Sequence, residues 1–88
     1  MLTYHAASHE GQPSLRLIGV LTIYTAAQAR TELPARMVEH GATVLDLSGI
    51  EELDTAGVQL LLWLKRGLVR RGEGLVLIGH SPAVVEAV

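Results

Sequence analysis

The sequence predicts an α/β domain in which helices pack on one face of a four- to five-stranded mixed sheet. Short apolar segments alternate with longer segments of helical periodicity in the order β-β-α-β-α-β-α. Strands that alternate with helices are joined by crossovers into a partly parallel sheet. The chain has no Phe and only 3% aromatic residues, so aliphatic side chains must build the core. Its 88 residues suffice for one domain, which we assign to residues 1–88.

The first two strands are expected at residues 2–7 and 14–22. Between them, His9–Pro13 contains Gly and Pro, which mark a turn. In the second strand Leu15 and Leu17 alternate with other side chains, which places both on one face. These segments therefore predict a β-hairpin.

The first helix is expected over residues 26–39, with Thr25 as its N-cap and Gly41 at its C-terminal end. Pro34 lies inside this segment. Proline lacks a backbone donor and clashes with the preceding turn of a helix. We therefore expect either a kink at Pro34 or two short helices.

The second half of the chain begins with a buried strand at residues 43–47, followed by a loop over Ser48–Asp54. A long helix over residues 55–71 and a strand at 75–78 come next. Ser81-Pro82 opens a final helix, with Ser as the N-cap and Pro as the first helical residue.

The start of the second helix is the most informative segment. Asp54 is placed to cap this helix, which leaves Thr55 as its first residue with an exposed hydroxyl. Ala56 and Gly57 are small, so a partner can approach the first turn. The helix end would favour a phosphate on Thr55 by about 0.3–1 kcal/mol. Asp54 and Asp46, expected near the same edge, would repel that phosphate and any acidic partner surface.

Capping alone also accounts for an Asp-Thr pair at a helix start. The residues mark Thr55 as accessible, and they leave open whether a kinase modifies it.

The second helix carries an unusually broad apolar band. Helical spacing of about 100° per residue places part of this band toward the sheet and leaves Trp63 outside it. The residues expected to face the sheet are Gly57, Leu60, Leu61, Leu64 and Leu68, and the band is extended by Val58, Leu62 and Val69. Trp63 lies beside Gln59, Arg66 and Arg70, a composition typical of interfaces. Alternatively, Trp63 covers the first helix as a partly buried lid.

Composition and spacing disfavour several classes of function. A net charge of -2 gives no basic field for nucleic acid, and the absence of Cys excludes disulfides and Cys-ligated metals. The four His residues are scattered, so we expect no metal site. We find no set of nucleophile, base and orienting group and no phosphate-binding loop, and expect neither catalysis nor a cofactor. Without a signal peptide or a span of ~20 apolar residues, we expect a cytoplasmic protein without membrane insertion.

One run of residues resembles the central motif of the STAS family. It comprises Asp46-Leu47-Ser48-Gly49-Ile50, then Leu53-Asp54-Thr55-Ala56-Gly57-Val58, then the leucines at 60–62. Residues 17–22 are similar to the family's second strand, and residues 75–79 with Ser81-Pro82 to its next strand and helix start. The resemblance extends from about Ser14 to the end of the chain, and the central motif is its specific part.

The resemblance implies the mixed sheet described above and a function by binding rather than turnover. STAS proteins of the anti-sigma factor antagonist type are bacterial signalling proteins that regulate transcription. They bind an anti-sigma factor kinase, which phosphorylates the hydroxyl residue after the motif Asp and thereby abolishes binding. Carried over to this chain, Thr55 is the phospho-acceptor. The partner-binding residues are then Asp46, Ser48, Asp54, Thr55, Ala56, Gly57, Val58, Gln59 and Trp63.

Two further types of STAS protein are similar at the same residues. Switch members usually carry Ser where this chain has Thr55, and Thr resembles the STAS subunit of bacterial phospholipid-transport ABC complexes. That subunit docks on an ATPase and need not be phosphorylated. Residues 21–27 resemble the small STAS protein associated with chemotaxis-type histidine kinases. Many members continue beyond the position of Val88, so we expect a C-terminally short domain whose apolar surface is covered by a partner or in a homodimer.

Overall fold

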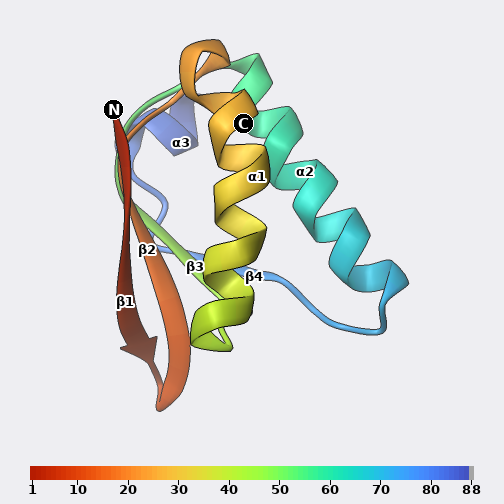
Figure 1. Cartoon of the computed structure of the whole chain (residues 1–88). Helices are drawn as coiled ribbons and strands as arrows, with labels where there is room; N and C mark the ends of the chain where they lie inside the picture. The colour runs from red at the N-terminus through yellow and green to blue at the C-terminus, as the bar shows by residue number, and fades with distance from the viewer. Residues whose placement is uncertain (88) are drawn as a thin grey trace.

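Four strands and three helices follow one another in the predicted order (Figure 1). The structure is a computed structural model that describes residues 1–87. The strands form one mixed sheet in the order β1-β2-β3-β4. Four strands lie within the predicted range of four to five, so the predicted fold class is confirmed.

The chain opens with the expected β-hairpin. β1 (Leu2–His9) pairs antiparallel with β2 (Gln12–Leu21). The two turn residues, Glu10 and Gly11, have positive φ angles of 51° and 79°. This is the backbone of a type I′ turn, whose twist matches that of the flanking strands.

The remaining strands add in parallel. β3 (Val44–Leu53) pairs with β2, and β4 (Val76–Ile78) pairs with the start of β3. The two crossovers are α1 (Ile23–His40) and α2 (Thr55–Arg70), which lie side by side on one face of the sheet (Figure 1). The short helix α3 (Pro82–Ala87) follows β4.

The core lies between the sheet and the helices and is mainly aliphatic. Leu15, Leu17 and Leu21 of β2 are fully buried, as the alternation in the sequence predicts. Leucines of β3 and α2 and Val84 of α3 belong to the same buried cluster. The two crossover helices, α1 and α2, and the terminal helix α3 thus contribute to one core.

The first helix begins three residues earlier than expected. Thr22 is the N-cap, and the hydroxyl of Thr25 accepts a hydrogen bond from the Thr22 backbone N–H at 3.0 Å. The two threonines therefore form a capping box, in which Thr25 is the third helical residue. The prediction of Thr25 as the N-cap is wrong, because a second capping residue lies just upstream. The predicted end is confirmed: Gly41 has the left-handed φ of 63° that closes many helices.

Pro34 does not divide this helix in two. α1 runs without interruption from Ile23 to His40, so the alternative of two short helices is wrong. Leu33 and Met37, on the two sides of the proline, are both buried in the core. We attribute the continuity to this packing, which outweighs the hydrogen bond that Pro34 removes.

Of the segment expected as a loop over Ser48–Asp54, residues 48–53 are instead the second half of β3, and Asp54 caps α2. Along β2 the inward positions recur every two residues, whereas in β3 they fall at Leu45, Leu47, Ile50 and Leu53. Two register shifts between the strands absorb the additional residues of β3. The prediction failed because these shifts break the period of two by which a strand is recognised in a sequence.

Candidate functional site

The N-termini of α1 and α2 are joined by a single carboxylate. Oδ1 of Asp54 accepts a hydrogen bond from the Gly57 N–H at 3.0 Å, which caps α2 as predicted. Oδ2 of Asp54 accepts a second bond from the Ile23 N–H, at 2.9 Å, in the first turn of α1. Free N–H groups at the starts of two helices are thus satisfied by one side chain.

These hydrogen bonds also fix the charge of the site. The N–H of Ile23, followed by that of Gly57, lowers the pKa of Asp54 below its usual value of 3.8. Hydrogen bonds to the ionised form favour that form. Asp54 is therefore a permanent negative charge at neutral pH, held between two helix ends.

Thr55 is the first residue of α2 and is exposed. Thr55 follows Asp54 in the sequence, so its side chain lies near that charged carboxylate. A hydroxyl at this place is accessible to another protein, and any group added to it would lie beside a fixed negative charge.

Gly57 points inward rather than toward a partner. It is buried, and a Cβ at this position would overlap the carbonyl oxygen of Leu21 at the end of β2. The absence of a side chain thus lets the first turn of α2 lie directly on the sheet. This agrees with the expectation that Gly57 faces the sheet, and its small size serves the contact with β2.

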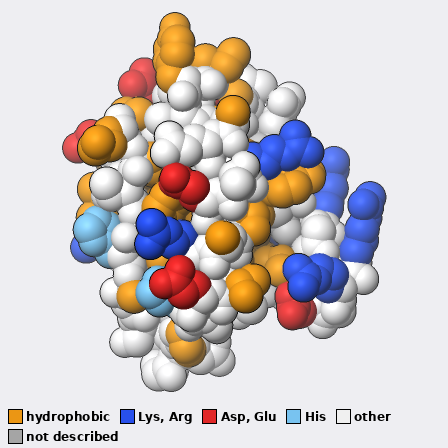
Figure 2. Space-filling model, viewed as in Figure 1, with side chains coloured by type: hydrophobic (Ala, Val, Ile, Leu, Met, Phe, Trp, Pro, Cys, Tyr) orange, Lys and Arg blue, Asp and Glu red, His pale blue; other side chains and the backbone are white. Residues whose placement is uncertain are grey.

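The start of α1 contributes residues that the sequence did not place at this site. Ile23 and Tyr24 are 67% and 93% exposed, and hydrophobic side chains project from the end of the molecule where both helices begin (Figure 2). We call the surface of Ile23, Tyr24, Thr55 and Gln59 the helix-start corner. The link between Asp54 and Ile23 spans two elements, so only the fold reveals it. The sequence signal that could have placed Ile23 and Tyr24 at an exposed helix start is their position directly after Thr22, which caps α1.

A shallow depression of about 290 Å³ adjoins this corner between the two helices. It is lined by Ala26, Ala27, Arg30, Ala56, Gln59, Leu60 and Trp63. Three of these seven residues are alanines, whose small side chains allow a partner side chain to approach both helices. Ala56 and Val58 are half-buried, whereas Gln59 is exposed.

Trp63 lies between α1 and α2, with 41% of its surface exposed. The guanidinium of Arg30, from α1, lies over the indole ring at 4.7 Å from its centre. Such a contact is worth about 0.5–1 kcal/mol at an exposed site. The geometry favours the interpretation of Trp63 as a lid over the first helix, with its arginine supplied by α1 rather than by Arg66 or Arg70.

Asp46 and Ser48 lie away from the helix-start corner. Asp46 is the third residue of β3, and its Oδ1 accepts a hydrogen bond from the Ser48 N–H at 2.9 Å. At about 3.3 Å per residue, the rest of β3 separates Asp46 from Thr55 by roughly 20 Å. The expectation that Asp46 lies at the same edge is wrong, because β3 continues where a loop was expected.

Within residues 1–87 we find no group of three or more His, Asp or Glu side chains that could hold a metal ion. Over the same part of the chain, no helix is both long and apolar enough to cross a membrane.

The sequence matches the family model described as Mlab, STAS domain, over residues 5–88. The chain belongs to the STAS domain family. This confirms the resemblance carried by the motif around Asp54. A comparison with curated proteins gave no significant match.

Two solved structures show the same STAS fold. An anti-sigma factor antagonist from Mycobacterium paratuberculosis is 23% identical, with a TM-score of 0.76 over 98% of this chain and 74% of that protein. The anti-sigma factor antagonist SpoIIAA, in its unphosphorylated form, is 20% identical, with a TM-score of 0.66 over 96% of this chain and 79% of that protein. At these identities the similarity establishes the fold.

Proposed function

We propose that this STAS domain is a non-catalytic docking switch that binds a partner protein at the helix-start corner and is released by phosphorylation of Thr55. The partner is an anti-sigma factor or a kinase of the serine-kinase or sensor-kinase type, in a cytoplasmic signalling pathway that regulates transcription. The observation that carries this proposal is the exposed Thr55 hydroxyl beside the fixed carboxylate of Asp54.

The corner has the properties of a preorganised protein interface. Ile23 and Tyr24 expose apolar surface at the start of α1, which the Ile23 N–H joins to Asp54, and Thr55 and Gln59 are exposed in the first turns of α2. The Asp54 bridge and the close contact of Gly57 with Leu21 hold the two helix ends in place. A surface that is already ordered loses little conformational entropy when a partner binds.

Phosphorylation would change the electrostatics of this surface more than its shape. A phosphate on Thr55 adds about -1.5 to -2 charges at pH 7. The helix N-terminus favours this charge, whereas Asp54, which remains ionised, repels it. A partner that packs apolar or acidic groups on the corner would then face a concentrated negative charge and dissociate. The solved relatives that share the fold are anti-sigma factor antagonists, which supports this type of switch.

Thr55 also supports a second candidate function. It is Thr rather than the Ser usual in switch members, which resembles the STAS subunit of a bacterial phospholipid-transport ABC complex. In that case the same corner docks on the ATPase subunit and Thr55 stays unmodified.

Affinity capture from native lysate, with bound proteins quantified by mass spectrometry, tests the docking surface. Replacement of Thr55 by Glu should lower partner affinity at least about tenfold, or about 1.4 kcal/mol, with little change in the melting temperature. Thr31→Glu is a matched control, because Thr31 is also an exposed threonine of a helix but lies two turns along α1. Equal partner recovery for Thr55→Glu and the wild type would refute the site.

Intact-mass measurement of the protein from its native cells separates the two candidates. A phosphate-sized increment that disappears in Thr55→Ala supports the switch. Unmodified protein that co-purifies stably with an ATPase supports the transporter subunit and contradicts the phosphorylation proposal.

A further inference from the structure

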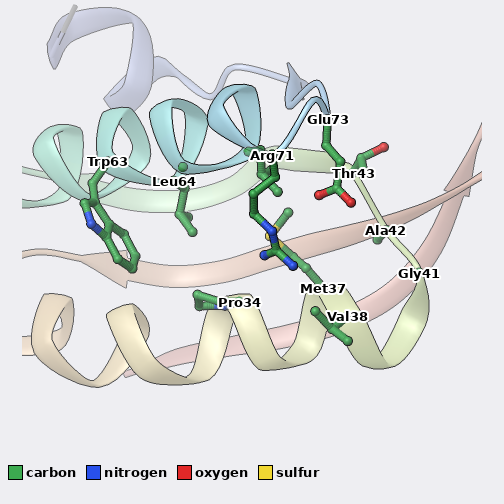
Figure 3. Close-up of a pocket in the computed structure, with 12 residues that line it drawn as sticks. Pro34, Met37, Val38, Gly41, Ala42, Thr43, Trp63, Leu64, Arg71 and Glu73 are labelled. Carbon is green, nitrogen blue, oxygen red and sulfur yellow. The ribbon is translucent and has the colours of Figure 1, made fainter.

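At the end of the helix pair remote from Thr55, α1 and α2 enclose a cleft of about 500 Å³ (Figure 3). Its walls are mainly apolar, with Pro34, Met37, Ala42, Trp63, Leu64 and Leu68 among the lining residues. Ligand pockets in proteins typically have volumes of about 300–1,000 Å³ and mostly apolar walls. The cleft is thus of a size and composition that suit a small molecule.

Gly67 borders the open space of this cleft. It lies within α2 and lines the cleft, and a Cβ placed there would meet no atom within 4 Å. Glycine inside a helix costs about 0.5–1 kcal/mol relative to alanine. Neither a close contact nor an unusual φ requires glycine at this position, and a larger side chain here would enter the open space of the cleft.

Two charged side chains lie at the cleft. Arg71, which follows α2, directs its guanidinium into the space between the helices, over the apolar lining (Figure 3). Glu73 places its carboxylate beside Thr43 at the end of the cleft (Figure 3). A planar guanidinium pairs well with a carboxylate, whereas Glu73 disfavours additional negative charge.

We propose that this cleft binds a small amphipathic monocarboxylate, with its apolar chain or ring between α1 and α2 and its carboxylate on Arg71. The apolar part would contact Leu64, Leu68 and Met37. A ligand with a single negative charge fits the pair of Arg71 and Glu73 better than a dianion does. The site is separate from the helix-start corner, so it does not depend on Thr55 or on its proposed role.

Trp63 lines the cleft and is the single tryptophan of the chain, so its fluorescence reports on occupancy. We would titrate the 88-residue chain with decanoate, decanol and decyltrimethylammonium, all as monomers in solution, and confirm the stoichiometry by calorimetry. Decanoate should give a saturable change at one site and bind more tightly than the other two. No saturable change with decanoate, or equal affinity for all three probes, would overturn the proposal.

Variants of the charged residues test the assigned orientation. Arg71→Gln should weaken decanoate binding about tenfold and leave decanol unaffected, because a charge-assisted hydrogen bond is lost. Glu73→Gln should strengthen decanoate binding about two- to threefold, since a repelling charge is removed. Arg66→Gln, at an exposed arginine that does not line the cleft, is the matched control and should change neither. Equal effects of the Arg66 and Arg71 variants would refute the role of Arg71.

Gly67→Leu tests the volume itself. The added side chain should fill the cleft and reduce decanoate affinity at least about tenfold, while circular dichroism confirms that the variant is folded. Unchanged affinity in a folded variant would contradict the site. If this variant fails to fold, the opposite effects of Arg71→Gln and Glu73→Gln still decide the proposal, because both residues are exposed outside the helix.

Discussion

The two ends of the α1–α2 pair are built in contrasting ways. Where the helices begin, the Asp54 carboxylate bonds to both of them and Gly57 lies against the carbonyl of Leu21. At the other end the same helices leave a cleft of about 500 Å³, and Gly67 faces open space. Close packing and hydrogen bonds thus fix one end, whereas spare volume remains at the other.

The difference shows that the presence of a glycine in a helix does not by itself indicate its structural role. Gly57 and Gly67 lie in one helix, yet the first is required for contact and the second leaves a gap. A fixed end suits the presentation of a hydroxyl at a defined position for a partner protein. An open apolar end suits the binding of a small molecule. Replacing the glycine at each end by alanine should therefore change the free energy of unfolding in opposite directions.

Gly57→Ala should produce the largest change. The new methyl group overlaps the backbone of β2, which cannot move without disturbing the sheet. We expect a loss of about 2–3 kcal/mol in the free energy of unfolding, the upper range for overpacking. Urea denaturation followed by circular dichroism measures it. A loss below about 0.5 kcal/mol would show that α2 does not lie as close to the sheet as described.

Asp54→Asn should have a smaller effect that depends on pH. An amide offers one acceptor oxygen, so it can keep only one of the bonds to Ile23 and Gly57. Because the pKa of Asp54 is lowered in the folded state, its contribution is complete well above 3.8 and is lost as pH falls through the folded pKa. The melting temperature of the variant should therefore be lower than that of the wild type at pH 7.

Thermal melts between pH 7 and pH 2.5 check this dependence. The difference between the wild type and Asp54→Asn should shrink toward the acid end of the range. A difference that stays constant with pH would show that the carboxylate charge does not contribute to the link between the helices.

Gly67→Ala should have the smallest effect and the opposite sign. The methyl group enters open space, and alanine favours the helix by about 0.5–1 kcal/mol over glycine. We expect a rise of that size in the free energy of unfolding, measured alongside Gly57→Ala under identical conditions. Destabilisation by Gly67→Ala would remove the contrast between the two ends.

Much of the architecture was predictable because the signals are local. The order of the elements, the cap at Asp54 and the glycine end of α1 depend on neighbouring residues. The buried leucines of β2 and α2 follow from strand and helix periodicity. The predictions failed where local signals competed or were broken, as at the two threonines of the capping box and along β3. Of the two alternatives at Pro34, the pair of short helices was wrong, because Leu33 and Met37 on its two sides are both buried in the core.

The sequence by itself determined the family motif and the position of an exposed hydroxyl at the start of α2. Those features rest on residue identity and on spacing within one element. Tertiary structure alone decided which residues share a surface. It moved Asp46 away from Thr55, linked the start of α1 to Asp54 through the Ile23 N–H, and opened the cleft beside Gly67. These relations depend on strand register and on the approach of one helix to another, which no single segment specifies.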